Sequence, residues 1–72
     1  MTKTDADAVA RFANLHDGGV PQPRADVVEY APGDYAVDIR SLSVVTSGGR
    51  RWTEIDTDRV LSRRSAARVL GY

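Results

Sequence analysis

The chain has 72 residues and no cysteine, so we expect one small domain over residues 1–72, without a disulfide framework or a thiolate metal site. A chain this short buries only about 60% of the surface that its unfolded form exposes, and such a domain often gains stability from a partner subunit. The net charge is zero, but residues 1–39 carry three basic and seven acidic residues and residues 40–72 carry seven basic and three acidic; the halves either neutralise each other or mark an interaction face.

The first predicted element is an amphipathic helix over residues 4–17. Thr4 is the expected N-cap, aspartates follow in the first turn, and Gly18 ends the helix. The expected apolar face consists of Val9, Phe12, Ala13, Leu15 and His16. No second metal-type ligand lies three or four residues from His16, so we interpret this histidine as a partly buried packing residue.

A linker and a β-hairpin follow. Two prolines make residues 18–24 an extended loop. Residues 27–39 alternate between apolar and polar on both sides of Pro32-Gly33, a pair that suits the central positions of a type II turn. The alternation predicts one inward-facing row, made of Val28, Tyr30, Tyr35, Val37 and Ile39.

The second strand of this hairpin raises a conflict after Ile39. Continued alternation would turn two serines inward and turn Leu42 and Val44 outward. We therefore expect a β-bulge or a break near residues 41–43, after which a new strand or a bent continuation begins.

The next turn and strand are predicted from glycine and tryptophan. Gly48-Gly49 between strand-like runs is typical of a two-residue hairpin turn. Residues 51–55 form the return strand, and Trp52 is its main apolar anchor.

A second helix is predicted over residues 57–70. Asp56 or Thr57 is the expected cap, and Gly71 ends the helix. Because the first apolar residues of this segment do not share a face with the later ones, we expect a kink near Ser62 or a first turn packed on two sides.

The predicted fold is therefore α+β. A small antiparallel meander of three to four strands is flanked by an N-terminal and a C-terminal helix, in the order α-β-β-(β)-β-α, and the helices cover one face. The expected core consists of Val9, Phe12, Leu15, Val28, Tyr30, Tyr35, Val37, Ile39, Val44, Trp52, Ile55, Val69 and Leu70.

The sequence offers little that indicates catalysis. Glu54 and Asp56 face the same side of a strand, with Asp58 nearby, and either bind a hard cation or serve as solvated charges that protect a strand edge. The chain lacks a nucleophile motif such as G-x-S-x-G. We expect a protein that is not an enzyme and that has no catalytic residues, no metal and no cofactor.

The arginines of the C-terminal half are the candidate contact residues. The Gly-Gly turn can form an anion-binding nest next to two arginines and a stacking face, and further arginines lie on the predicted second helix. The candidate contacts for a partner or a nucleic acid are Arg50, Arg51, Trp52, Arg63, Arg64 and Arg68.

One of these segments resembles a known family. Ser62-Arg63-Arg64-Ser65-Ala66, together with the α-β-β-β-α order, resembles the double-stranded-RNA-binding domain, whose second helix opens S-K-K-x-A. The resemblance implies phosphate contacts from Arg63 and Arg64. The chain departs from the family in lacking a glycine-rich approach to this helix and in having a shorter helix.

We expect a non-enzymatic interaction or assembly module that binds another protein or itself. The alternative is a small nucleic-acid-binding regulator that uses the arginine-rich half. No apolar run reaches the length of a membrane span, so we expect no membrane partner and a cytoplasmic location. Arginine outnumbers lysine nine to one, a bias typical of a high-GC genome such as that of an actinobacterium or its phage.

Overall fold

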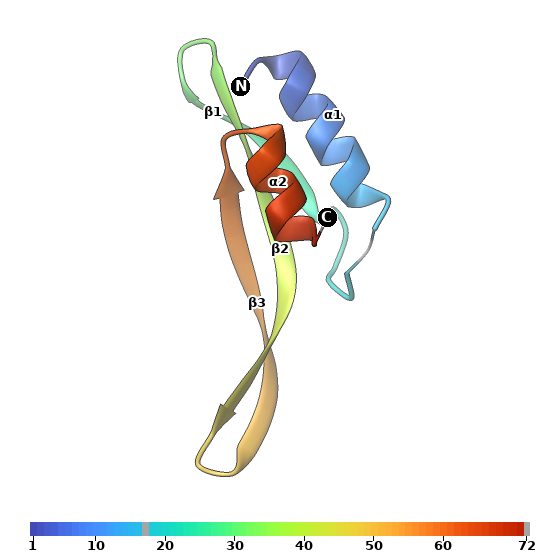
Figure 1. The fold of residues 1–72 in the computed structure, drawn as a ribbon, viewed down its shortest axis with the longest axis vertical. Helices are drawn as coiled ribbons and strands as arrows, with labels where there is room; N and C mark the ends of the chain where they lie inside the picture. The colour runs from blue at the N-terminus through green and yellow to red at the C-terminus, as the bar shows by residue number, and fades with distance from the viewer. Residues whose placement is uncertain (17, 72) are drawn as a thin grey trace.

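Two helices pack against a three-stranded antiparallel sheet in the computed structural model, which describes residues 1–16 and 18–71. The elements are α1 (Lys3–Asn14), β1 (Ala25–Ala31), β2 (Asp34–Ser47), β3 (Arg50–Val60) and α2 (Arg63–Leu70). The strands lie in the order β1-β2-β3, so β2 is central (Figure 1). The predicted α+β class and its α-β-β-β-α order are confirmed, with three strands rather than four.

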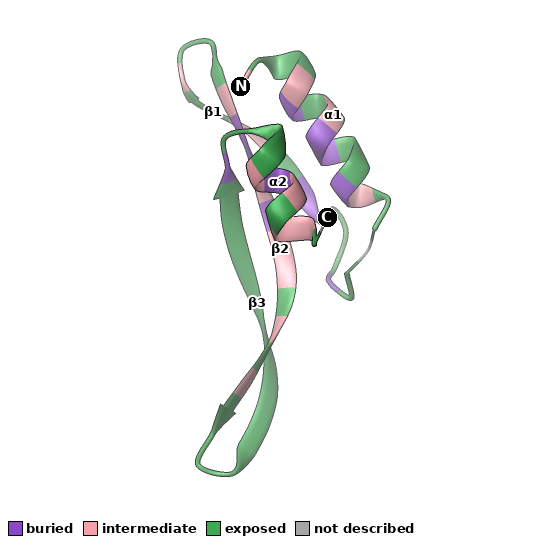
Figure 2. Cartoon of the chain, viewed as in Figure 1, coloured by how far each residue is buried: buried purple, intermediate pink, exposed green. Residues whose placement is uncertain are grey.

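Both helices pack on one face of the sheet, and the core between them is built largely from small residues. Its buried members are Ala6, Val9, Ala10, Ala13, Ala25, Val37, Ile39, Val60 and Ala66, with Met1, Val27, Tyr35, Val69 and Leu70 packed around them. Figure 2 shows these buried residues gathered in the half of the molecule that contains the helices. Alanine on both helices lets their backbones approach the sheet closely, so the core is thin and lies only beneath the helices.

The helix α1 begins earlier and ends earlier than the sequence indicates. Thr2, not Thr4, is the N-cap, because its hydroxyl accepts a hydrogen bond from the Asp5 N–H at 3.2 Å. Leu15 is the C-cap, and the predicted last residue, Asp17, lies outside the described residues. The predicted core residues Phe12 and Leu15 are 44% and 77% exposed, because the core is reached by the alanine stripe of this helix and not by its larger side chains.

The first hairpin is confirmed, and Tyr35, Val37 and Ile39 face the core as predicted, but the inward-facing residues of β1 are not those predicted. Gly33 has φ of 78° in the predicted turn, as that position requires. The register shifts between Glu29 and Ala31, so that Val27 pairs with Val37 and Val28 lies on the opposite face. Directly opposite residues share a face. Val28 therefore points away from the helices, and Tyr30, which has no partner at the register shift, is 46% exposed.

The bulge expected near residues 41–43 is absent. The pairing of β2 with β3 runs without interruption from Val37↔Val60 to Ser47↔Arg50. The alternation therefore continues, and Leu42 and Val44 are turned outward, 47% and 56% exposed. The prediction was wrong because it assumed that every apolar residue of this strand must reach a core, and no helix covers this part of the strand.

The strand β3 extends well past its predicted end at Ile55, to Val60. The segment expected to start a helix at residue 57 instead continues the ladder, and its last residue, Val60, is only 2% exposed. The N-cap of α2 is Ser62, whose Oγ accepts from the Ser65 N–H at 3.1 Å. The expected kink is therefore a strand-to-helix boundary, and Gly71 ends the helix as predicted, with φ of 87°.

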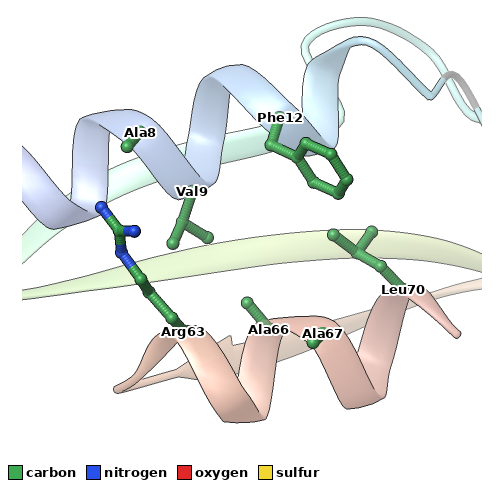
Figure 3. Close-up of a pocket in the computed structure, with 7 residues that line it drawn as sticks. All are labelled: Ala8, Val9, Phe12, Arg63, Ala66, Ala67 and Leu70. Carbon is green, nitrogen blue, oxygen red and sulfur yellow. The ribbon is translucent and has the colours of Figure 1, made fainter. Parts of the chain in front are cut away.

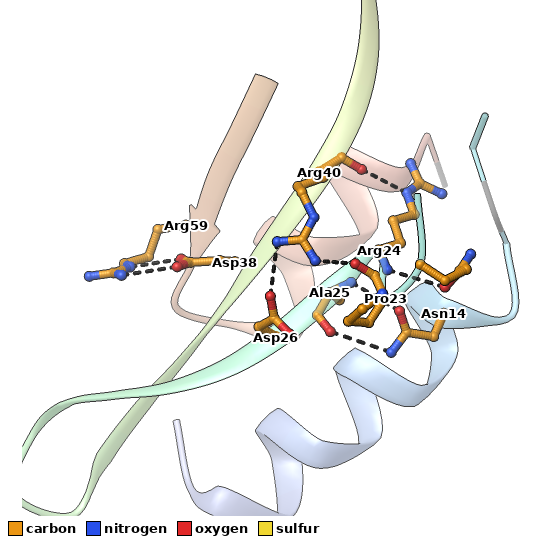
Figure 4. A network of polar contacts seen from close by, with 9 residues as sticks. Asn14, Pro23, Arg24, Ala25, Asp26, Asp38, Arg40 and Arg59 are labelled. Carbon is orange, nitrogen blue, oxygen red and sulfur yellow. Dashed lines mark hydrogen bonds and ion pairs between the residues drawn. The ribbon is translucent and has the colours of Figure 1, made fainter. Parts of the chain in front are cut away.

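The loop before β1 is held by a buried arginine that the sequence reading treated as part of a linker. Arg24 is 8% exposed. Its guanidinium donates to the backbone oxygen of His16 at 2.8 Å, to that of Arg40 at 2.9 Å and to Ser41 Oγ at 3.4 Å. Asn14 joins the same region, since its side chain bonds the N–H and the C=O of Ala25 (Figure 4). These contacts attach the loop to β2 at the point where β1 begins.

Candidate interaction surface

The second hairpin projects beyond the rest of the domain as a two-stranded arm. The pairing of β1 with β2 stops at Ala25↔Ile39, followed by one hydrogen bond from Arg40 N to Arg24 O. Figure 1 shows the β2–β3 hairpin continuing away from both helices, which gives the molecule a long axis of 46 Å against 23 and 20 Å. We define the β-arm as residues 42–55. An isolated two-stranded ribbon of this kind is marginally stable in water.

Large apolar side chains lie on both sides of the β-arm. Leu42 pairs with Ile55, and Val44 lies two residues along the same side; Leu42, Val44 and Ile55 are 47%, 56% and 49% exposed. On the other side Trp52 pairs with Val45 and is 41% exposed. The sequence reading placed three of these side chains in the core, and the structure corrects this: Val44, Trp52 and Ile55 are surface residues.

The strand β3 also leaves a free edge. Among residues 1–16 and 18–71 it pairs only with β2, on one side, and every residue of the strand before Val60 is exposed (Figure 2). Such an edge presents unpaired backbone N–H and C=O groups to a further strand.

The six predicted contact residues fall into two separate groups. Arg50, Arg51 and Trp52 lie at the tip of the β-arm, and Trp52 Nε1 donates to Glu54 Oε1 at 2.9 Å. The other three are on α2, which Figure 1 places in the half of the molecule opposite the arm tip. The structure therefore does not bring the six residues together into one basic surface.

The ion pairs of the fold join the acidic half of the chain to the basic half. Within the described residues they are Arg40–Asp26 at 2.9 Å, Arg59–Asp38 at 2.8 Å and Arg63–Asp5 at 3.2 Å, the first two drawn in Figure 4. Each joins an aspartate of residues 1–39 to an arginine of residues 40–72. Much of the charge asymmetry is therefore neutralised inside the fold.

The Arg59–Asp38 pair is bidentate. Arg59 Nε and Nη2 donate to the two carboxylate oxygens of Asp38 at 2.8 and 3.0 Å. This hydrogen bonding holds the pKa of Asp38 below its ordinary value, against a smaller opposing effect of desolvation, and raises the pKa of Arg59. Near the first hairpin turn, a hydrogen bond with Glu29 raises the pKa of Tyr35.

The residues that suggested metal or acid–base chemistry do not converge. In residues 1–16 and 18–71, no group of three or more histidine, aspartate or glutamate side chains is arranged to hold a metal ion. His16 is exposed rather than partly buried, and its Nδ1 lies 3.0 Å from the backbone oxygen of Phe12, with the two rings 4.9 Å apart. These two contacts lie at the end of α1.

A shallow apolar groove separates the two helices (Figure 3). Its volume is about 450 Å³, and it is lined by Ala8, Val9, Phe12, Arg63, Ala66, Ala67 and Leu70. Arg63 is the polar side chain of this lining, and it is engaged by Asp5. The groove therefore offers a ligand apolar walls but few groups that would fix its orientation.

Comparisons with known proteins give this chain no relative. No protein-family model matches it, and neither the curated proteins nor the solved structures include a significant match. The resemblance of Arg63 and Arg64 to the start of the second helix of double-stranded-RNA-binding domains thus has no support from these comparisons. No helix within the described part of the chain is long and apolar enough to cross a membrane.

Proposed function

We propose that this chain is a non-enzymatic interaction module that assembles with protein through the β-arm. The observation that carries the proposal is the half-exposed row of Leu42, Val44 and Ile55 on a ribbon that the domain's own core does not cover. Scattered exposed apolar residues are ordinary. Here three lie on one side of two paired strands, where they form a continuous patch suited to a protein partner.

The β-arm also has the backbone groups needed for recognition by strand addition. In this mode a partner strand bonds to a free sheet edge, and side-chain patches on the two faces provide specificity. The arm has a free β3 edge, with Trp52 on one side of it and Ile55 on the other. Binding would give this marginal ribbon the additional strand that it lacks.

The alternative, nucleic-acid binding through the arginine-rich half, receives less support from the geometry. Phosphate binding requires several cations on one surface. Three of the arginines of residues 40–72 are engaged by aspartates, and the six candidate contacts are divided between the arm tip and α2. Under this alternative the phosphate contacts are Arg50 and Arg51, beside Trp52.

The proposal is tested by the mass of the protein in solution. Sedimentation velocity is measured from about 1 µM to about 1 mM, which covers weak association, on the wild-type chain and on the Leu42→Thr/Ile55→Thr variant. Threonine keeps the strand propensity while removing the apolar surface. The matched control is Leu61→Thr, which removes a leucine that is 52% exposed outside the arm.

We expect the wild-type chain to associate, the arm variant to be monomeric, and the control to behave as wild type. A wild-type chain that stays monomeric, with no arm-dependent binding to proteins of its source cell, would overturn the proposal. The same measurement with duplex DNA or RNA tests the alternative. A complex that weakens steeply with salt and is lost in Arg50→Ala/Arg51→Ala would replace protein assembly with nucleic-acid binding.

A further inference from the structure

We infer that the partner of the β-arm is a second copy of this chain, bound by antiparallel pairing of the two β3 edges with Thr53 opposite Thr53 on a two-fold axis. This inference rests on the proposed function and names its partner. The observation that supports this inference most directly is the order of charges in the outer half of β3, where Arg50 and Arg51 are followed by Glu54 and Asp56. A strand that is basic at one end and acidic further along is complementary to itself when reversed.

The free edge of β3 is physically suited to such pairing. Natural edge strands are commonly protected by proline, by bulges or by dense charge. The strand β3 contains no proline, and its register with β2 is unbroken from Arg50 to Val60. The protection comes from charges alone. Because those charges have both signs, most registers between two β3 strands would place like charges opposite each other, and only a few would not. The charges therefore favour one specific dimer over unlimited aggregation.

The permitted register follows from symmetry. In a two-fold antiparallel pair, directly opposite residues lie on the same side of the sheet, so one residue must face its own copy at the centre. With Thr53 at the centre, Arg50 faces Asp56 and Arg51 faces Ile55. Trp52 then faces Glu54, the residue whose carboxylate already accepts its indole N–H within one chain. No like charges are opposed in this arrangement, and two Arg50–Asp56 pairs form.

The neighbouring registers are less favourable. Centring the pair on Glu54 opposes the two Glu54 carboxylates, and centring it on Ile55 opposes Arg51 and Arg59 twice; like charges directly opposite are destabilising. Centring it on Trp52 opposes no like charges but pairs only residues 50–54, whereas the Thr53 register pairs residues 50–56. The Thr53 register is therefore the longest overlap among these without opposed like charges.

Dimerisation in this register would join two marginal ribbons into one four-stranded sheet. Three or more strands with an apolar face are far more stable than a lone hairpin. Leu42, Val44 and Ile55 of the two copies would lie on the same side of this sheet, since a two-fold axis perpendicular to the sheet leaves each side unchanged. The apolar rows of the two arms would thus share one side of the sheet, with Arg51 and Thr53 of both copies between them.

Single cysteines test the register directly, because the chain has no cysteine of its own. Opposite residues of an antiparallel pair have Cα atoms about 4.5 or 5.5 Å apart, within the range that a disulfide bridges. Thr53→Cys should therefore form a covalent dimer under mild oxidation. Thr57→Cys is the matched control: it lies on the same side of the same strand, but in this register the two copies would be about 27 Å apart, at 3.4 Å per residue.

Charge exchange provides a second, independent test. Arg50→Asp should weaken the dimer about tenfold or more, because two attractive pairs become repulsive. Arg50→Asp/Asp56→Arg restores opposite charges across the axis and should return the dissociation constant to within about threefold of wild type. Arg64→Asp is the control for the same change of charge away from the strand. Circular dichroism spectra confirm that each variant is folded.

The outcomes separate this inference from the proposed function. Selective cross-linking at Thr53 with rescue by charge exchange supports both. Association that requires Leu42 and Ile55, but with equal cross-linking of Thr53→Cys and Thr57→Cys, overturns the edge-paired dimer and leaves the arm as a docking site. Arm-dependent binding only to a different protein likewise overturns the dimer. A monomer indifferent to every arm variant overturns both.

Discussion

Replacing Arg24 by methionine should substantially destabilise the domain, although this residue lies in a loop. Arg24 is 8% exposed, and its guanidinium bonds two backbone oxygens, those of His16 and Arg40, at 2.8 and 2.9 Å. Its own N–H and C=O also bond, to Gln22 Oε1 and to Arg40 N. Methionine retains much of the aliphatic length of arginine but donates no hydrogen bond. The substitution therefore removes the link between the loop and the base of the β-arm.

The expected cost follows from these contacts. A hydrogen bond with a charged partner contributes about 1.5–3 kcal/mol, and two short ones are lost; the third, to Ser41 Oγ at 3.4 Å, is weak. Release of the guanidinium from burial offsets part of this loss. We expect a net cost of about 2–4 kcal/mol, against a total stability of roughly 4–11 kcal/mol for a domain of this size. The melting temperature should fall by about 8 °C or more.

Urea denaturation followed by circular dichroism measures this cost, with the exposed Arg68→Met as control. Arg24→Lys should also be destabilising, because a single ammonium cannot reproduce the planar guanidinium fork and its charge stays buried. If Arg24→Met changed the free energy of unfolding by less than about 0.5 kcal/mol, the desolvation of the guanidinium would cancel its hydrogen bonds. The view that Arg24 holds the loop would then be refuted.

Three further predictions address the core, an ion pair and a turn. Ile39→Ala, at a fully buried site, should lower the free energy of unfolding by about 2–5 kcal/mol. Ile55→Ala, at a site 49% exposed, should lower it by less than about 2 kcal/mol at concentrations where the chain is monomeric. Equal losses for the two variants in urea denaturation would contradict a solvent-exposed arm. Because Arg59 lowers the pKa of Asp38, the stability from this pair is present above the unfolded value of about 3.9 and is lost as pH falls through the lower folded value. For this partly exposed pair, wild type should exceed Asp38→Asn by at most about 1 kcal/mol near pH 6, and the gap should close in acid; a gap independent of pH would refute this. Gly49→Ala should cost about 1–2 kcal/mol, since Gly49 has φ of 78°, and an unchanged melting temperature would argue against this turn geometry.

The turns and the element order could be predicted because their signals are local. Pro32-Gly33 and Gly48-Gly49 each connect two paired strands, and Gly71 ends α2 with a positive φ. Gly33, Gly48 and Gly49 all have positive φ, a backbone conformation that few residues other than glycine adopt. The boundary between β3 and α2 was misplaced, because Asp56 and Thr57 are good helix caps that here pair with β2 instead.

The candidate surface was only partly predictable. Arg50 and Arg51 were predicted as candidate contacts, and the structure places them at the tip of the β-arm. Trp52 was predicted both as a contact and as a core residue, and it is 41% exposed beside them. The exposure of Leu42 and Ile55 was missed, because an apolar residue in a strand was taken to indicate a core. The outward alternation of Leu42 and Val44 was in fact the available signal, and it was interpreted as a bulge.

The α+β class, the order of the elements and the positions of the tight turns follow from residues adjacent along the chain, and the lack of disulfides follows from the absence of cysteine. Which faces of the strands are buried depends instead on contacts between distant segments. One register shift between Glu29 and Ala31 exchanged the inner and outer rows of β1, and the two short helices cover only part of β2 and β3. A strand pattern specifies two faces but not whether another element covers them, so the exposure of the β-arm follows from the lengths and docking of α1 and α2.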